Sequence, residues 1–467
     1  MSIDFPKNWK QVVLEDALDA LIDYRGKTPK KVDKGIPLIT AKVVKSGRIL
    51  PMDEFIADED YESWMVRGIP QISDIVVTTE APLGEVAQIK NANVALAQRI
   101  VTLRGKVDFL ENDFLLFLMQ SDFVQNQLEA RATGSTVKGI KQSELRKIIL
   151  PIPPIAEQKC IGKILSDLDD KIHLNNQINQ TLESIAQAIF KSWFIDFEPV
   201  RAKILAKQEG KDPELAAMCA ISGKSEVELE QMAEDDFAEL QATAALFPDE
   251  LVESELGEVP RGWGIGCVGD IAMAKGGYAF KSSQFVEKGC PVIKIKNIVG
   301  NGEVDIQDTQ CIEEKTARTS TKFILKDGDL VMAMTGATVG KIGLVNTYGK
   351  SIYLNQRVAK FESDVFGNKV SYYLFCLFNR QEYFEQVVGA AQGSAQPNIS
   401  SSGIESTKIV VPDFELINQF FIKVDSIFQF WLKNGLENNA LREIRDTLLP
   451  KLLSGEIDVF NVKESLA

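Results

Sequence analysis

The sequence predicts an α+β chain made of two similar mixed α/β domains, each followed by a long helix. The first observation is an internal repeat, in which residues 6–9 (Pro-Lys-Asn-Trp) return as residues 260–263 (Pro-Arg-Gly-Trp). The second is its spacing, which is 254 residues between Trp9 and Trp263 but a constant 259 from Leu115 and Leu374 onward. Loops tolerate insertions, whereas one residue inserted into a helix rotates its apolar face by about 100°. Each copy is therefore expected to have a variable globular part and a helical part of fixed length.

The first globular part is expected over residues 1–157. Residues 75–79 and 99–103 are rich in β-branched side chains and are predicted to form strands. Residues 110–132 have apolar side chains at helical spacing. Prolines in residues 151–154 then end this part and introduce the next helix. Residues 258–415 repeat the pattern.

The helical parts are expected over residues 158–204 and 416–467. Their apolar side chains recur mostly every three or four residues, which is typical of a coiled-coil seam. Both seams carry Asn at equivalent places; these are Asn175 with Asn434, and Asn179 with Asn438. A buried Asn can fix the register of packed helices, so this pattern favours two helices packed together with Asn near Asn. The alternative is an exposed polar position on an amphipathic helix.

Composition indicates an ordinary soluble protein in a reducing, cytoplasmic compartment. Apolar residues make up 45% and charged residues 25% of its 467 residues, and no apolar run approaches the length of a membrane span. The six cysteines form no CxxC pair, which argues against a zinc site. The net charge of −14 is concentrated in residues 205–257, where 14 acidic side chains face three lysines. We expect this segment to be a solvated, partly helical connector, so local basic surfaces remain possible elsewhere.

Motifs for bond chemistry are largely missing from the sequence. His173, which is the single histidine, falls inside the first seam helix, where a general base is not expected. Residues 336–341 (Gly-Ala-Thr-Val-Gly-Lys) are one residue short of a phosphate loop, and Ile342 stands where Ser or Thr would bind magnesium. We interpret them as a connection between two strands. A nuclease site built from scattered carboxylates remains open.

Polar, glycine-rich segments recur in both copies and are the candidates for DNA contact. Arg can read guanine and Asn or Gln can read adenine, while Gly, hydroxyl groups and Lys suit close approach to a phosphate backbone. The first copy supplies Thr78, Thr79, Gln98, Arg99, Gly134, Ser135 and Lys138. The second copy supplies Thr335, Gly336, Lys341, Asn355, Gln356, Arg357, Gly393, Ser394, Gln396 and Asn398. Ordinary turns that cap a sheet would leave the same pattern, because a duplicated fold also duplicates its turns.

Several segments in this order resemble the specificity subunits of type I DNA restriction–modification systems, the HsdS family. They are residues 6–9, 150–158, 189–199, 256–263 and 441–456, and the resemblance covers essentially the whole chain. One departure is at residues 412–418 (Pro-Asp-Phe-Glu-Leu-Ile-Asn), which lack the Pro-Pro and Glu-Gln of residues 153–158. This departure concerns the start of the second helix.

The resemblance implies two target recognition domains, 1–157 and 258–415, joined by two antiparallel coiled-coil helices in a pseudo-two-fold arrangement. Each domain would read one half of a split, asymmetric site in double-stranded DNA. The helices would act as a spacer and as a docking platform for two modification (methyltransferase) subunits, through which the restriction motor-nuclease subunits join the complex. The chain itself would be non-catalytic and would hold no cofactor.

Two alternatives from other classes remain open at this point. One is a protein-binding scaffold without DNA recognition, and the other is a solitary metal-dependent nuclease. A scaffold would show no salt-dependent binding to DNA, whereas a protein that contacts phosphates loses affinity steeply with salt.

Overall fold

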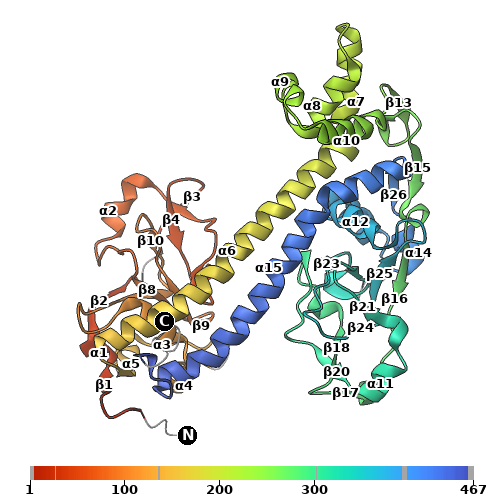
Figure 1. The fold of residues 1–467 in the computed structure, drawn as a ribbon. Helices are drawn as coiled ribbons and strands as arrows, with labels where there is room; N and C mark the ends of the chain where they lie inside the picture. Colours follow the sequence, from red (N-terminus) through yellow and green to blue (C-terminus); the bar gives the residue numbers. More distant parts are fainter. Residues whose placement is uncertain (1–4, 27, 135–136, 301, 392–396, 461–467) are drawn as a thin grey trace. The chain divides into compact units, whose positions relative to one another are not determined.

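The chain forms two compact units, residues 1–173 with 440–467 and residues 174–439. The structure is a computed structural model that describes residues 5–26, 28–134, 137–300, 302–391 and 397–460. Both units contain mixed sheets beside portions of two long helices, α6 (Ile155–Phe194) and α15 (Phe414–Ser454) (Figure 1). Within the described residues, no helix is both long and apolar enough to cross a membrane. The α+β class expected from the sequence is confirmed.

The first unit is built on two main sheets. The antiparallel sheet has the strand order β2 (Leu18–Asp23), β11 (Ile100–Gly105), β8 (Ile75–Thr79) and β9 (Leu83–Gln88). The second, mixed sheet has the order β10 (Ala95–Leu96), β4 (Ile36–Ile39), β7 (Phe55–Ile56) and β3 (Lys31–Val32). Two smaller antiparallel pairs are β1 (Lys10–Val13) with β12 (Ile149–Ile152) and β5 (Val44–Lys45) with β6 (Arg48–Ile49).

Both faces of the antiparallel sheet in this unit are buried. Ile75 and Val77 of β8 pack in a core with the helices, whereas Val76, which points to the other face, packs against the second sheet. This explains why residues 75–79 read as a continuous β-branched run instead of an alternating one. The helices of the unit, besides its portions of α6 and α15, are α1 (Leu14–Ala17), η1 (Asp58–Asp60), α2 (Tyr61–Trp64), α3 (Asn112–Gln120), α4 (Asp122–Arg131) and α5 (Gln142–Leu145).

The second unit repeats this plan. Its first sheet has the order β16 (Met273–Gly276), β25 (Val358–Glu362), β22 (Leu330–Ala333), β23 (Ile342–Leu344) and β19 (Gly302–Glu303). Its second has the order β17 (Phe285–Val286), β20 (Gln310–Ile312), β18 (Cys290–Ile293), β24 (Ile352–Leu354) and β21 (Ile324–Leu325). The smaller pairs are β15 (Gly264–Cys267) with β26 (Lys408–Val411) and β13 (Leu251–Ser254) with β14 (Gly257–Pro260).

The same strand order in both units confirms the internal repeat. β2-β11-β8-β9 corresponds to β16-β25-β22-β23, and β10-β4-β7-β3 corresponds to β24-β18-β20-β17. The β4–β10 and β18–β24 pairs are parallel in both units. The second unit adds β19 and β21 at the edges of its sheets.

The helices of the second unit include counterparts of α3, α4 and α5. Those counterparts are α12 (Val370–Phe378), α13 (Gln381–Gly389) and α14 (Ser401–Glu405). Shorter helical turns are η2 (Val268–Asp270), η3 (Ser282–Gln284), η4 (Ile295–Asn297), α11 (Glu314–Arg318), η5 (Thr321–Phe323), η6 (Gly336–Thr338) and η7 (Gly367–Lys369). The turn η6 lies between β22 and β23, which confirms that residues 336–341 connect two strands.

The segment expected as one helical unit over residues 158–204 is divided in the structure. Helix α6 ends at Phe194, and α7 (Glu198–Gln208) begins after Phe197, whose φ of 53° interrupts the helix. Pro199 occupies the first turn of α7, where a missing backbone N–H costs nothing. A sharp break of this kind is set by one left-handed residue and is not visible in the apolar periodicity.

The acidic segment is partly helical, as expected, and its helices also pack against the core of the second unit. It contains α8 (Pro213–Ser222), α9 (Glu226–Glu230) and α10 (Glu234–Ala245), which bury apolar side chains such as Met218 and Leu240 in the core of the second unit. Lys203 of α7 is buried, and its Nζ donates to Glu214 Oε1 at 2.7 Å and to the Phe247 carbonyl at 2.8 Å. Most acidic side chains remain on the outside of these amphipathic helices.

The start of the second long helix follows the repeat despite its divergent motif. Helix α6 begins at Ile155 and α15 at Phe414, which is again an offset of 259 residues. In the first copy Trp9 Nε1 donates to Glu157 Oε1 at 3.2 Å, and Gln158 is buried. The second copy has Leu416 and Ile417 at these two positions, both fully buried. Apolar packing therefore takes the place of hydrogen bonding at this helix start.

Candidate nucleic-acid interface

Three segments that are distant in sequence meet at one end of the antiparallel sheet in the first unit. The N–H of Thr79, at the end of β8, donates to the Arg99 carbonyl at 3.0 Å, just before β11 begins. The N–H of Ile140 donates to the Thr79 carbonyl at 2.9 Å, and Glu80 forms an antiparallel bridge with Gly139. The structure thus brings the end of β8, the Gln98–Arg99 pair and residues 139–140 together.

Thr78 and Thr79 lie beneath this junction and not on its surface. The two residues are 0% and 1% exposed. Thr78 Oγ1 accepts a hydrogen bond from the Glu85 N–H at 2.9 Å, and Thr79 Oγ1 donates to the Arg99 carbonyl at 3.2 Å. Both hydroxyl groups therefore hold the backbone that carries the exposed side chains.

Gln98 and Arg99 are on the surface of the junction. Gln98 Oε1 accepts from Thr28 Oγ1 at 2.9 Å. The Arg99 side chain is 54% exposed and forms an ion pair with Glu80, with 3.0 Å between Nε and Oε1. Both residues line a hollow of about 360 Å³, to which Lys31, Lys42 and Glu54 also contribute. Lys31 pairs with Glu54 and Lys42 with Asp53, each at 2.8 Å. The hollow is therefore lined by hydrogen-bonding groups of both charges, a chemistry that suits a ligand with donors and acceptors.

Residues 133–134 and 137–139 lie close together and are attached to the sheet. Gly134 has a φ of +109°, and a Cβ there would lie 2.1 Å from the Val137 carbonyl oxygen, so only glycine fits. Lys138 forms an ion pair with Glu129 of α4. Arg25 donates from Nη1 to the Ile140 carbonyl at 2.9 Å and fixes the end of the loop.

The second unit has the same junction. The N–H of Met334 donates to the Arg357 carbonyl at 3.0 Å, and the N–H of Ile399 donates to the Met334 carbonyl at 2.9 Å. Thr335 forms an antiparallel bridge with Asn398, and its Oγ1 donates to the Pro397 carbonyl at 3.3 Å. The bonds match those of Thr79, Arg99 and Ile140 one for one, so Thr335 occupies the place of Glu80.

The side chains around this second junction differ in their partners. Gln356 and Arg357 are exposed, and among the described residues the Arg357 guanidinium has no hydrogen-bond or ion-pair partner. Asn355 is buried, and its Oδ1 accepts from the Arg357 N–H at 3.3 Å, so it shapes the turn beneath the pair. The N–H of Gly336 donates to the Pro397 carbonyl, while Lys341 Nζ donates to the Val299 carbonyl at 3.4 Å.

Four of the sequence candidates cannot be placed. Ser135, Gly393, Ser394 and Gln396 lie outside the described residues.

Three residues outside the predicted set position these groups. Glu80, which follows Thr78 and Thr79 in the same polar run, pairs with Arg99. Arg25 holds the loop end, and Tyr278 bridges Asn355 in the second unit. A lone acidic residue directly after a β-branched strand was a usable signal for Glu80. Arg25 and its partner Ile140 are 115 residues apart in the sequence, so no local sequence pattern predicts their contact.

Among the described residues of the two units, no cluster of three or more His, Cys, Asp or Glu side chains could hold a metal ion. His173 lies at the end of the first unit's portion of α6. Partial burial, followed by the nearby Arg48 charge, lowers its pKa from the usual value.

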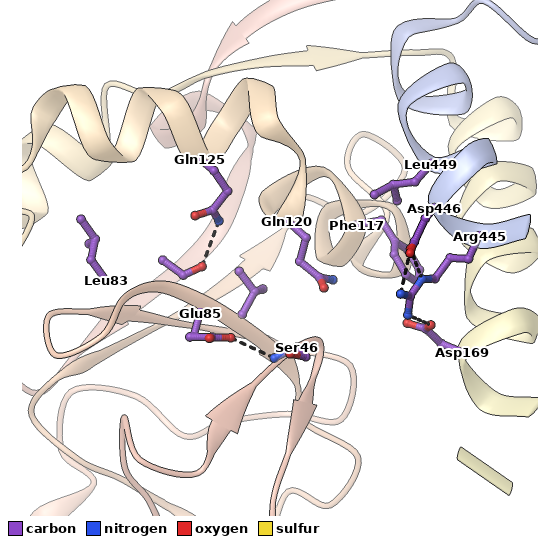
Figure 2. A pocket seen from close by; sticks show the side chains of 12 residues that line it. Ser46, Leu83, Glu85, Phe117, Gln120, Gln125, Asp169, Arg445, Asp446 and Leu449 are labelled. Atoms are coloured by element: carbon purple, nitrogen blue, oxygen red, sulfur yellow. Dashed lines mark hydrogen bonds and ion pairs between the residues drawn. The ribbon is translucent and has the colours of Figure 1, made fainter. Parts of the chain in front are cut away.

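A second polar hollow of about 390 Å³ lies in the first unit (Figure 2). Arg445 of α15 reaches Asp169 of α6 at 2.8 Å there, and Glu85 of β9 accepts from the Ser46 N–H at 2.9 Å. Arg48 Nη2 also donates to the Asp169 carbonyl at 2.6 Å. The Arg48 contact ties the globular part of the first unit to α6, and the Arg445 contact ties α15 to α6.

Comparison with known proteins gives concordant matches. The family model described as "Type I restriction modification DNA specificity domain" matches twice, over residues 6–184 and 260–444. The specificity subunit of the type I restriction enzyme HindI from Haemophilus influenzae is 34% identical over 382 residues, covering 78% of this chain and 82% of that protein. The MjaIX specificity subunit from Methanocaldococcus jannaschii is 25% identical, with 97% and 94% covered.

A solved structure shares the fold. It is the crystal structure of the S subunit of a type I restriction-modification system from M. genitalium, with a TM-score of 0.54 and 16% sequence identity. The match covers 97% of this chain and 98% of that chain.

Proposed function

Because this chain belongs to the type I restriction–modification DNA specificity family, we propose that it is the DNA-reading, non-catalytic subunit of such a complex. Residues 1–157 and 258–415 would each read one half of a split, asymmetric site in double-stranded DNA. The chain would supply sequence recognition, and the partner subunits would carry out methylation and cleavage with their own cofactors.

The observation that carries this proposal is the repeated junction. In both units the same two backbone hydrogen bonds and the same antiparallel bridge place a Gln-Arg pair with an exposed arginine at the end of a sheet, beside the end of a loop whose sequence is rich in glycine and polar residues. Gln and Arg are side chains that read base edges bidentately, whereas the loop suits the backbone. The residues around the two pairs differ, as Glu80 and Thr335 show, which favours two unlike half-sites.

The two long helices support the second part of the proposal, docking of modification subunits. Both carry large apolar side chains that are exposed in the chain alone; they are Leu174, Ile185, Phe414, Ile422, Phe430, Leu436 and Ile444. Apolar groups of this kind on a helix surface are typical of a contact with a further protein. Two such subunits fit a chain whose helical parts are themselves repeated.

Mapping of modified bases tests the proposal. The chain is co-expressed with the modification subunit of its own system, and modified positions are located across the host genome. A single split, asymmetric motif that disappears without this chain is the expected result. Exchange of residues 258–415 for those of a relative should change one half of the motif only; a motif that is independent of this chain contradicts the proposal.

Binding measurements give a second readout. The assembled complex should lose affinity for DNA with increasing salt, since lysines and arginines at phosphates release counterions. Lys341→Ala should reduce the slope of log K against log salt by about 1. A complex whose DNA binding does not depend on salt would instead indicate a protein scaffold.

A further inference from the structure

We propose that Glu80 and Arg99 together read one G·C base pair in the half-site of the first domain. Arg99 would donate to the guanine and Glu80 would accept from the cytosine amino group of the same pair. This inference rests on the proposed function and adds to it a residue, Glu80, and a base-pair class.

The geometry places the two side chains next to each other and in contact with solvent. Glu80 follows β8 and Arg99 precedes β11, two neighbouring antiparallel strands. Their side chains are 46% and 54% exposed, with Nε 3.0 Å from Oε1. Among the described residues neither side chain has another partner, so the remaining oxygen and terminal nitrogens are available to a ligand.

The backbone beneath the pair is held on several sides. Thr79 bonds to the Arg99 carbonyl through both its N–H and its Oγ1, and Glu80 bridges Gly139. A Cβ on Gly139 would lie 3.3 Å from Glu80 Cβ and 3.4 Å from the Thr79 carbonyl oxygen, so glycine permits this close approach. A fixed backbone limits where both side chains can point, which is what recognition of a base edge requires.

Stability does not account for the pair. Exposed ion pairs contribute only ~0–1 kcal/mol, and both partners are about half exposed. A carboxylate at a surface that faces DNA phosphates would be repelled unless it has a specific partner. Arg99 supplies that partner in the free chain, and a cytosine amino group would supply it in the complex.

The chemistry selects one base pair. In the major groove guanine presents the acceptors N7 and O6, and cytosine presents the N4 amino donor. The terminal nitrogens of Arg99 can donate to both guanine acceptors while the carboxylate accepts from the cytosine amino group. An A·T pair offers the arginine only adenine N7 beside the amino donor, and it sets the carboxylate against thymine O4. A T·A pair offers the arginine only thymine O4 beside the methyl group, so neither pair gives it two adjacent acceptors.

The second domain provides an internal contrast. Thr335 stands in the place of Glu80, and Arg357 has no carboxylate partner among the described residues. The second half-site should therefore not depend on a carboxylate at this position. The inference thus concerns one base pair of one half-site.

The test is the modified-base map of the co-expressed complex with Glu80→Gln and, separately, Arg99→Gln. Both variants should make the same G·C position degenerate, with about a tenfold or greater loss of discrimination. The position should lie in the half-site that survives exchange of residues 258–415, and the other half should be unchanged. The control is Glu15→Gln on α1. It removes the ion pair between Glu15 and Arg146 and should leave the motif unchanged.

Other outcomes overturn the inference. An unchanged motif, a degenerate position that is not G·C, or two variants that affect different positions would each do so. A uniform loss of affinity with an unchanged motif would assign both side chains to phosphate contact. Thermal melting shows whether the complex with Glu80→Gln assembles. If it does not, the modified-base maps of Arg99→Gln and Glu80→Asp are used, and both should show the same degenerate G·C position. Absence of a split motif with the unaltered chain would contradict the proposed function itself.

Discussion

Asn175 donates through Nδ2 to Asn438 Oδ1 at 3.0 Å, and this bond has an image elsewhere in the same unit. Asn434, which lies 259 residues after Asn175, donates to Oδ1 of Asn179 at 2.9 Å, and Asn179 lies 259 residues before Asn438. If each residue is replaced by its counterpart in the other copy of the repeat, the first bond becomes the second. On α6 the chain runs from Asn175 to Asn179, whereas their partners on α15 run from Asn438 back to Asn434. The two helices are therefore antiparallel here and related by a pseudo-two-fold axis. The expected Asn-to-Asn packing is confirmed, and all four side chains are buried.

Loss of one member of this cluster should destabilise the chain. Asn434→Ala leaves the buried Asn179 oxygen without its donor, and we expect a decrease of ~1–3 kcal/mol in the free energy of unfolding. Urea unfolding of the purified chain measures this change. Gln180→Ala, at an exposed position of α6 next to Asn179, should change it by less than about 0.5 kcal/mol.

Replacement of both members should be milder. Asn179→Leu with Asn434→Leu removes both members of this hydrogen bond, so neither amide is left without the other, and the loss should be smaller than for either single change to alanine. The contrary result is a double variant that loses as much free energy of unfolding as the two single variants added together. That result would show that the two side chains stabilise the chain by more than the hydrogen bond between them.

Arg357→Ala should affect one half-site only. Removal of an arginine that reads a base costs ~1–3 kcal/mol of discrimination at its position, and we expect this in the half-site read by residues 258–415. Competition binding of the complex to duplexes altered in one or the other half measures it. Equal effects on both halves, or none, would remove Arg357 from the proposed interface.

Gly134→Ala should impair the first half-site without unfolding the chain. The new Cβ would collide with the Val137 carbonyl, so the loop must change shape. Recognition of the first half-site should fall at least tenfold, while the melting temperature stays within about 2 °C. Gly210→Ala also has a positive φ, but its Cβ meets no atom within 4 Å, and it should leave DNA recognition unchanged.

Glu183 should make the stability of the chain depend on pH. Burial, followed by the nearby Glu303 charge, raises its pKa above the usual value. The folded chain therefore binds this proton more tightly than the unfolded chain, and stability is lost as the pH rises from the unfolded pKa through the folded one.

The variant Glu183→Gln tests this sign. The amide keeps an acceptor for Asn379 Nδ2, which now donates to Glu183 Oε1 at 3.1 Å, but it carries no charge. The melting temperature should rise by about 1–3 °C at pH 8 and by less at pH 5. A larger gain at pH 5 would contradict the raised pKa. Glu15→Gln, which is exposed, serves as the control.

The sequence by itself determined the duplication, the fold class and the family. The constant 259-residue offset is a local consequence of helical geometry, since an insertion would turn the apolar face away from its partner. That offset predicted equivalent Asn positions and equivalent helix starts, which were expected near residues 158 and 416 and are found at Ile155 and Phe414. The family resemblance, confirmed by the double match to the family model, also came from local motifs.

Only the tertiary structure decided which residues meet. Nothing local shows that Asn175 pairs with Asn438 instead of Asn434, because antiparallel packing sets that choice. The burial of Thr78 and Thr79 depends on the strands beside β8, although their hydroxyl groups look suited to DNA contact. Glu80 and Arg99 are 19 residues apart, and only the β8–β11 pairing makes them neighbours. Periodicity and composition record which face of an element is buried, whereas partners are fixed by the register between elements, which depends on packing across the whole unit.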